Sequence, residues 1–187
     1  HSRSRTKTVY FVYSGEVMLY NLTKHGNRKV IFILGKGQLL NQSIVSKKPN
    51  ALFCEAVCPV KVIEIAEEQF LQLMEQSHAL TRAVLREYER NLWRMGHQLK
   101  NTTGNMQMER KIATKLWKLG RDFGVDTEDG VMIDIDLTIT LMADLVGAPR
   151  ENVSRACKVL TDRGLIRYGN KRFILTDSDG LAEFYKM

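Results

Sequence analysis

A run of polar and basic side chains between Arg150 and Arg172 has the residue types and spacing for contacts with nucleic acid. Seven basic residues in this stretch face only Glu151 and Asp162, a local balance of +5. Arginine can pair bidentately with guanine, glutamate can accept from cytosine N4, and clustered cations neutralise phosphates and release counterions. The candidate DNA-contacting residues are Arg150, Glu151, Asn152, Ser154, Arg155, Lys158, Lys171 and Arg172.

The whole-chain charge does not locate this site. The chain of 187 residues has a net charge of +7, but residues 1–106 carry all of that excess, and residues 107–187 carry 13 basic and 13 acidic side chains. A compact basic patch matters more for phosphate binding than a diffuse excess. The local pattern therefore carries the prediction.

The elements that would position these residues form a helix-turn-helix. Leu141, Met142 and Leu145 give a first short helix an apolar face, Gly147 suits the sharp turn, and Pro149 suits the first turn of the next helix. Ala148 offers no capping side chain. The second helix is two-faced, and its inward set is Val153, Ala156, Cys157 and Leu160. Glu151 and Arg155 are four residues apart, so we expect each to hold the other.

A hairpin follows the second helix and predicts a wing. Residues 165–168 and 172–175 are its strands across Gly169-Asn170-Lys171, and Arg167 adds a further charge. Before the helix-turn-helix we expect a helix over 108–123 ended by Gly124, an acidic loop over 126–130 and a strand over 131–135. Asp134 and Asp136 alternate on that strand and are expected to be solvated; no metal site is predicted.

The first third of the chain predicts strands. Runs rich in branched and aromatic residues cover 9–13, 17–20, 30–34 and 61–65, and they are separated by Ser14-Gly15, His25-Gly26-Asn27 and Gly35-Lys36-Gly37. This is typical of an antiparallel roll. A short helix with Phe70, Leu71 and Met74 follows.

A long helix from about Ala79 to Thr102 carries an apolar seam. Its members alternate three and four residues apart, which is the a/d spacing of helices that pack in pairs: Leu85, Tyr88, Leu92, Met95 and Leu99. A second stripe, Leu80, Val84, Tyr88 and Asn91, could pack on the chain's own core and leave the seam for a partner. Packing of the seam itself within the domain is the alternative. Residues 102–105 are the best candidate for a hinge.

The order of roll, long helix and winged helix-turn-helix resembles the cyclic-AMP receptor protein and fumarate-nitrate regulator superfamily. The resemblance rests on Ser14-Gly15-Glu16-Val17, on the turns at Gly26 and Gly35-Lys36-Gly37, and on residues 150–155, Arg-Glu-Asn-Val-Ser-Arg. It implies an α+β protein with an N-terminal antiparallel β-roll of the cupin-like, cyclic-nucleotide-binding type. It also implies a homodimer, a palindromic operator in double-stranded DNA, a small-molecule effector in the roll, and RNA polymerase as a possible partner.

By this resemblance Arg150, Glu151 and Arg155 read bases and Ser154 is secondary. The implied divisions are 1–78 for the effector-sensing roll, 79–103 for the dimerisation helix and hinge, and 104–187 for the DNA-binding domain. We expect the beginning of the roll to be missing from this sequence. The three cysteines and the lack of a membrane-spanning run or secretory signal favour a reducing cytoplasm.

The effector positions depart from the family pattern. Cyclic-AMP binders carry Gly-Glu and Arg-Ser pairs, where this chain has Asn41-Gln42 and Asn50-Ala51. Without the Arg, a cyclic phosphate loses its bidentate partner, so the sequence argues against cyclic AMP; haem and an iron–sulfur cluster also lack support. Cys54 and Cys58 are expected to be core cysteines that form no disulfide. His97 is either an effector contact or a half-exposed polar position on the long helix.

The leading hypothesis is a ligand-gated, sequence-specific transcription regulator controlled by a small-molecule effector in the roll. The resemblance also implies a candidate effector class, because a subgroup of the family binds aromatic or halogenated organic acids. The alternative is an effector-independent regulator, or a protein-interaction module, with a vestigial sensor domain. An enzyme is a third hypothesis. No nucleophile–base pairing, metal-ligand spacing or phosphate loop supports it.

Overall fold

The computed structural model describes residues 6–46, 48–102 and 106–186, without the side chains of residues 99–102. The chain divides into two compact units. One contains residues 1–26 and 30–100, and the other contains residues 27–29 and 101–187.

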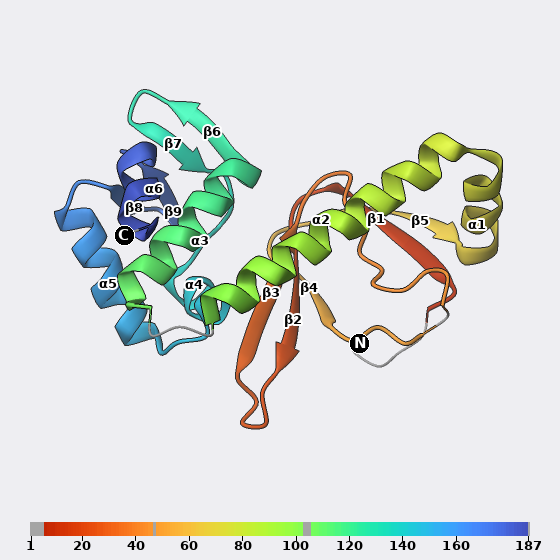
Figure 1. The fold of residues 1–187 in the computed structure, drawn as a ribbon, viewed down its shortest axis with the longest axis horizontal. Helices are drawn as coiled ribbons and strands as arrows, with labels where there is room; N and C mark the ends of the chain where they lie inside the picture. The colour runs from red at the N-terminus through yellow and green to blue at the C-terminus, as the bar shows by residue number, and fades with distance from the viewer. Residues whose placement is uncertain (1–5, 47, 103–105, 187) are drawn as a thin grey trace. The chain divides into compact units, whose positions relative to one another are not determined.

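The first unit is the expected antiparallel roll followed by two helices. Strand β1 (Thr8–Ser14) pairs with β5 (Lys61–Ala66), and a three-stranded sheet has the order β3 (Arg28–Leu34), β2 (Val17–Leu22), β4 (Phe53–Ala56). Helices α1 (Glu67–Gln76) and α2 (His78–Thr102) follow β5 along the chain, as Figure 1 shows. The predicted α+β class with an N-terminal roll is confirmed.

The roll and its helices share an apolar core. Val9 of β1, Leu39, Ile44, Phe70 of α1 and Val84 of α2 form one buried cluster. Burial of such side chains contributes roughly 1.5–3 kcal/mol each. Because α1 and α2 both supply members, this core fixes the start of the long helix on the roll.

Asn41 ties the loop after β3 into this core. Its side-chain Oδ1 accepts from the backbone N–H of Tyr10 at 2.7 Å, and its Nδ2 donates to the carbonyl of Thr8 at 2.9 Å. The Tyr88 hydroxyl of α2 donates to the Asn41 carbonyl at 3.4 Å. Burial raises the pKa of Tyr88 to about 12, so the phenol remains a donor at neutral pH.

Helix α2 carries two different faces. Val84 is buried, and Leu80, Tyr88 and Asn91 are partly buried, as the second stripe predicts. Leu85, Leu92 and Met95 of the seam are exposed by 55%, 71% and 46%. Tyr88, which the spacing places on both stripes, therefore lies on the border and turns toward the core. Leu99, the last seam residue, falls among the side chains outside the described residues.

The second unit is a winged helix-turn-helix. Helix α3 (Met108–Phe123) leads through β6 (Gly124–Thr127) and β7 (Gly130–Ile133) to α4 (Ile139–Val146) and α5 (Arg150–Asp162), and β8 (Ile166–Gly169), β9 (Arg172–Leu175) and α6 (Ser178–Lys186) follow. The four strands form one sheet in the order β6-β7-β9-β8. The fully buried side chains of the second unit include Ile112, Leu116, Met142, Leu160 and Phe173.

Two local expectations for this unit were wrong or incomplete. Helix α3 ends at Phe123 before Gly124, as predicted, but Gly124 is extended with φ −76°, and residues 126 and 127 of the expected loop belong to strand β6 of a hairpin. Helix α6 was not predicted; Asp177 caps it, accepting from the Gly180 N–H at 2.8 Å, and Leu181 and Ala182 bury its inner face. The proposed hinge falls at the end of α2, and its residues 103–105 lie outside the described residues.

The cap of α4 gives a first testable prediction. The Thr138 hydroxyl accepts from the Leu141 N–H at 3.0 Å. Replacing Thr138 with Ala removes this bond and should lower the free energy of unfolding by about 1 kcal/mol, measured by denaturant titration of the full chain. Thr140→Ala is the matched control, because Thr140 is exposed inside the helix. Equal losses in the two variants would contradict a capping role.

Candidate nucleic-acid interface and effector loop

The turn between α4 and α5 is built around Gly147. This residue has φ 70°, a left-handed conformation that favours glycine, and its N–H donates to the Ala143 carbonyl at 2.8 Å. Helix α5 begins at Arg150, so Pro149 is the flanking cap residue rather than part of the first turn. The Pro149 carbonyl still accepts the first helical bonds, from Asn152 and Val153. The sequence analysis placed Pro149 in the first turn of this helix, so the predicted start was one residue too early.

Helix α5 is anchored by one face and offers the other to solvent. Val153, Ala156, Cys157 and Leu160 are buried, with at most 5% exposed, as predicted. The opposite face is exposed or half-exposed and consists of Arg150, Glu151, Asn152, Ser154, Arg155 and Lys158. A recognition helix requires this division, since the packed face fixes the helix while the polar face meets base edges.

Arg155 is held by a different partner from the one expected. Its guanidinium donates to the Asn152 side-chain oxygen at 2.5 Å, three residues earlier. The predicted pair between Glu151 and Arg155 is absent from the part of the chain that the structure describes. Glu151 therefore keeps its carboxylate available at the start of α5, and Asn152 takes a positioning role.

The wing is a tight hairpin of β8 and β9. Gly169 pairs with Arg172, so Asn170 and Lys171 form a two-residue turn with φ values of 50° and 60°. Both positive values belong to the turn type whose twist suits a hairpin. The Lys171 side chain is exposed at the tip.

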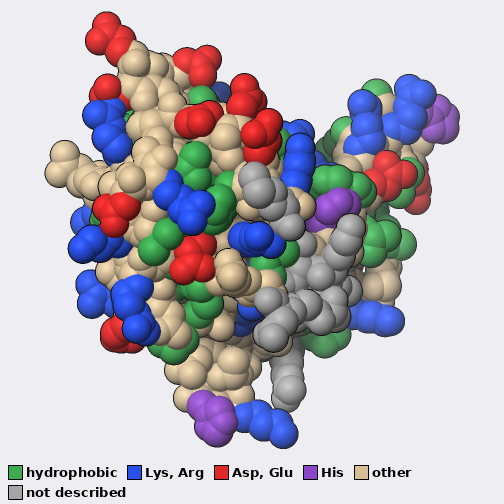
Figure 2. Space-filling model, turned by 60° about the vertical axis from the view of Figure 1, so that its left-hand side comes forward, with side chains coloured by type: hydrophobic (Ala, Val, Ile, Leu, Met, Phe, Trp, Pro, Cys, Tyr) green, Lys and Arg blue, Asp and Glu red, His purple; other side chains and the backbone are tan. Residues whose placement is uncertain are grey.

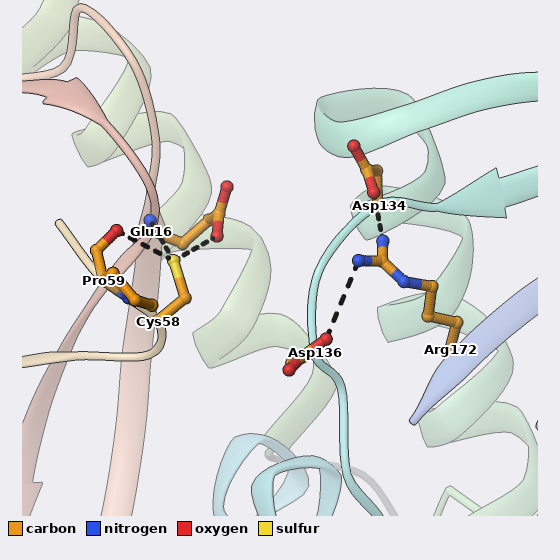
Figure 3. Close-up of polar contacts among 6 residues, drawn as sticks. All are labelled: Glu16, Cys58, Pro59, Asp134, Asp136 and Arg172. Carbon is orange, nitrogen blue, oxygen red and sulfur yellow. Dashed lines mark hydrogen bonds and ion pairs between the residues drawn. The ribbon is translucent and has the colours of Figure 1, made fainter. Parts of the chain in front are cut away.

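Two basic residues of the wing are paired with acids. Arg172 contacts Asp134 and lies 3.7 Å from Asp136 (Figure 3). The expectation that these two aspartates are simply solvated was therefore wrong. Arg167 pairs with Asp129 at 2.5 Å. The basic patch is therefore smaller than the sequence count indicates. Five of its seven members have no ion pair among the described residues: Arg150, Arg155, Lys158, Arg163 and Lys171.

The surface charge is mixed rather than uniformly basic. Figure 2 shows Lys and Arg side chains separated by acidic ones, with acids gathered toward the top of the face drawn. Asp126, Glu128 and Asp129 are exposed in the β6–β7 hairpin. Such acids repel phosphates, so the charge pattern limits where a nucleic acid can approach.

The candidate effector residues separate into three environments. Gln42 Oε1 accepts from the backbone N–H groups of Ala51 and Leu52 at 2.7 and 2.9 Å, and the Asn50 side chain accepts from the Gln42 N–H at 3.5 Å. The structure thus brings Gln42, Asn50 and Ala51 together. Asn41 is instead committed to the core, through the bonds given above.

Among the described residues, the contacts of His97 are with Trp93 of α2 and not with this loop. Its ring lies against that of Trp93, one turn earlier on α2, with a centroid separation of 3.8 Å and an angle of 34° between the ring planes. Trp93 is 57% exposed and was not singled out from the sequence. The sequence feature that could have identified Trp93 is that a large aromatic residue lies outside the stripe of α2 that packs on the core.

The cysteines correct one prediction. Cys157 is buried as expected, and burial raises the pKa of its thiol to about 11, which keeps it protonated. Cys54 is exposed and Cys58 is partly exposed, so they are not core cysteines. The Cys58 thiol donates to the Glu16 carboxylate at 3.0 Å (Figure 3). All three are free thiols, and no group of metal-ligating side chains occurs among the described residues.

Comparison with known proteins matches the two halves of the chain to two domain families. Residues 1–77 match the cyclic nucleotide-binding domain, and residues 110–184 match the Crp-like helix-turn-helix domain. The chain belongs to the CRP/FNR superfamily of transcription regulators. No helix among the described residues is long and apolar enough to span a membrane.

Individual relatives cover nearly the whole chain at low identity. A CRP-like cAMP-activated global transcriptional regulator of Mycobacterium tuberculosis is 25% identical over 93% of this chain and 78% of its own length. A global nitrogen regulator of Nostoc sp. is 25% identical over 88% of this chain and 74% of its own. FixK2 from Bradyrhizobium japonicum superposes with a TM-score of 0.83 at 21% identity, covering 97% of this chain and 89% of its own.

Arg155 supplies the prediction for the interface. Replacing Arg155 with Ala should remove about 1–3 kcal/mol of operator preference, while weak, salt-sensitive binding to random DNA remains. The measurement is a gel-shift titration of operator against random DNA. Arg86→Ala, which removes the same charge from an exposed position of α2, should keep the preference. A variant at 155 that discriminates as well as wild type would overturn the assignment.

Proposed function

We propose that the chain acts as a homodimeric, sequence-specific DNA-binding regulator whose α5 helices read a palindromic operator. The observation that carries the proposal is the division of α5 between a buried apolar face and an exposed polar face. Arg150, Glu151 and Arg155 are the base-reading residues, and Ser154 and Lys158 are further contacts. Two recognition helices must meet half-sites about one turn of DNA, ~34 Å, apart, which requires a dimer of fixed geometry.

The seam of α2 supports self-association. Leu85, Leu92 and Met95 are large apolar side chains with roughly half or more of their surface exposed on one helix. Exposed apolar rows of this kind mark interaction surfaces. The spacing of three and four residues fits a second copy of the same helix, because knobs of one helix then enter holes of the other.

Leu92 tests the dimer directly. Replacing Leu92 with Glu places a charge in the seam of each copy, and we expect a monomer by sedimentation equilibrium and a loss of operator affinity. Ala83→Glu is the matched control, since Ala83 is exposed on the other side of α2 and the added charge is the same. A Leu92 variant that remains dimeric at the concentration where wild type is dimeric would contradict the proposal that the seam is the dimer interface.

We infer that the roll does not take cyclic AMP. A cyclic phosphate would need backbone donors and an arginine at residues 50–52, but Gln42 already occupies the N–H groups of Ala51 and Leu52. Asn50 stands where the family's cyclic-AMP binders carry the arginine. A less charged small molecule is the effector class that this loop favours; the solved relative titled "OCPA complexed CprK" shares the fold with a TM-score of 0.71.

Thermal unfolding with cyclic AMP checks this inference. At millimolar nucleotide we expect no rise in the unfolding temperature of this chain, because only a ligand that binds the folded state stabilises it. The cAMP-activated relative from Mycobacterium tuberculosis is the positive control under the same conditions. A saturable stabilisation of this chain would contradict the inference.

A second function has support from the same loop. Gln42 accepts from the backbone N–H groups of Ala51 and Leu52, so these two donors have a partner within the chain itself. An effector-independent regulator with a vestigial sensor is therefore the alternative. Operator selection from random DNA, with and without cell extract, separates the two, since an effector-gated protein would select its operator only with extract.

A further inference from the structure

Arg172 connects the wing to the segment that enters the helix-turn-helix. Asp134 and Asp136 follow β7 and are exposed, whereas Ile135 and Leu137 between and after them are buried. The two carboxylates therefore share the outer side of one extended segment, and the Arg172 side chain reaches both of them from the start of β9 (Figure 3). Its guanidinium has the fork geometry to hold two carboxylates.

A main-chain bond joins the same two segments. The Leu137 N–H donates to the Lys171 carbonyl at 2.7 Å. Leu137 directly precedes Thr138, the cap residue of α4. The tip of the wing is thus joined by side chain and backbone to the start of the helix-turn-helix.

The conformation of the tip needs such support. Lys171 has φ 60° in a position of the turn where glycine is strongly favoured. A non-glycine residue persists in this conformation when surrounding contacts over-determine it. Arg172 is the next residue, and its contacts with the two aspartates supply that constraint.

We propose that Arg172 is a positioning residue, which holds the wing tip so that Lys171 meets the DNA backbone, and that Arg172 does not itself contact DNA. This inference rests on the proposed function. If Arg172 lay against a phosphate while keeping its contacts with Asp134 and Asp136, it would bring both carboxylates toward the phosphates, and like charges at close range repel. Lys171, adjacent at the tip and without an ion pair among the described residues, has no such conflict.

The decisive variant removes the acids rather than the arginine. Asp134→Asn with Asp136→Asn weakens the hold on Arg172, and we expect operator affinity to fall about two- to fivefold, the range of an exposed ion pair. Loss of two negative charges would by itself favour DNA, so the sign of the change is informative. Tighter binding by this variant would show that Arg172 had been restrained from the DNA and would overturn the proposal.

A cycle with Lys171 tests the route of the effect. Arg172→Ala should weaken binding in the wild-type background but leave the affinity and salt slope of Lys171→Ala unchanged, because the contact it positions is already gone. A direct contact would lower the slope by about one in both backgrounds. That result overturns the proposal, as does a Lys171→Ala variant that binds the operator like wild type.

Two controls keep the outcomes separate. Asp179→Asn removes one exposed carboxylate from α6 and should not lower operator affinity. All variants are compared by thermal unfolding, since Arg172 is only partly exposed. If wild type shows no preference for any operator, the proposed function fails. If wild type prefers its operator but the variants at Asp134, Asp136, Lys171 and Arg172 do not give the results expected above, only the positioning role fails.

Discussion

The packing of α5 through its buried face is the interaction on which the DNA-binding unit depends. Val153 and Leu160 have no exposed surface, and they lie two turns apart on the same side of the helix. This anchoring fixes the rotation of the helix about its own axis, so the direction of every polar side chain on the outer face follows from it. The cap at Thr138 sets where α4 begins, and the turn at Gly147 ends α4 and leads to the start of α5.

The two faces of α5 and of α2 could be predicted from the sequence because burial follows helical periodicity. Val153, Ala156, Cys157 and Leu160 recur at three- and four-residue spacing, and the structure buries all four. The roll was predictable for a similar reason, since its strands are short branched runs between turn residues. Helix α6 was not predicted because its apolar face is short and the main sequence feature that marks it is the single cap at Asp177.

Partner choice among charged side chains could not be predicted in the same way. Glu151 and Arg155 have ideal helical spacing, yet Asn152 takes the arginine. Arg172 meets Asp134, which is 38 positions away in the sequence. Such pairs depend on strand register and on which rotamer a long side chain adopts, and exposed ion pairs are too weak to dictate the fold. A count of basic residues therefore overstated the cationic surface of the wing.

The loop segments that carry the candidate effector residues Asn41, Gln42, Asn50 and Ala51 show the same limits. The sequence analysis treated Asn41 and Gln42 as one adjacent pair of candidate effector residues, but the two side chains have different partners in the structure. Asn41 bonds the core strand β1 and, through its carbonyl, the Tyr88 hydroxyl of α2, whereas Gln42 closes the loop onto Ala51 and Leu52. Beside them, the Gln38 amide donates to Glu87 of α2 at 3.3 Å. Gln38 and Asn41 both precede Gln42 by a few residues and both contact α2, so a displacement of Gln42 would act on a segment that is bonded to the helix that carries the seam.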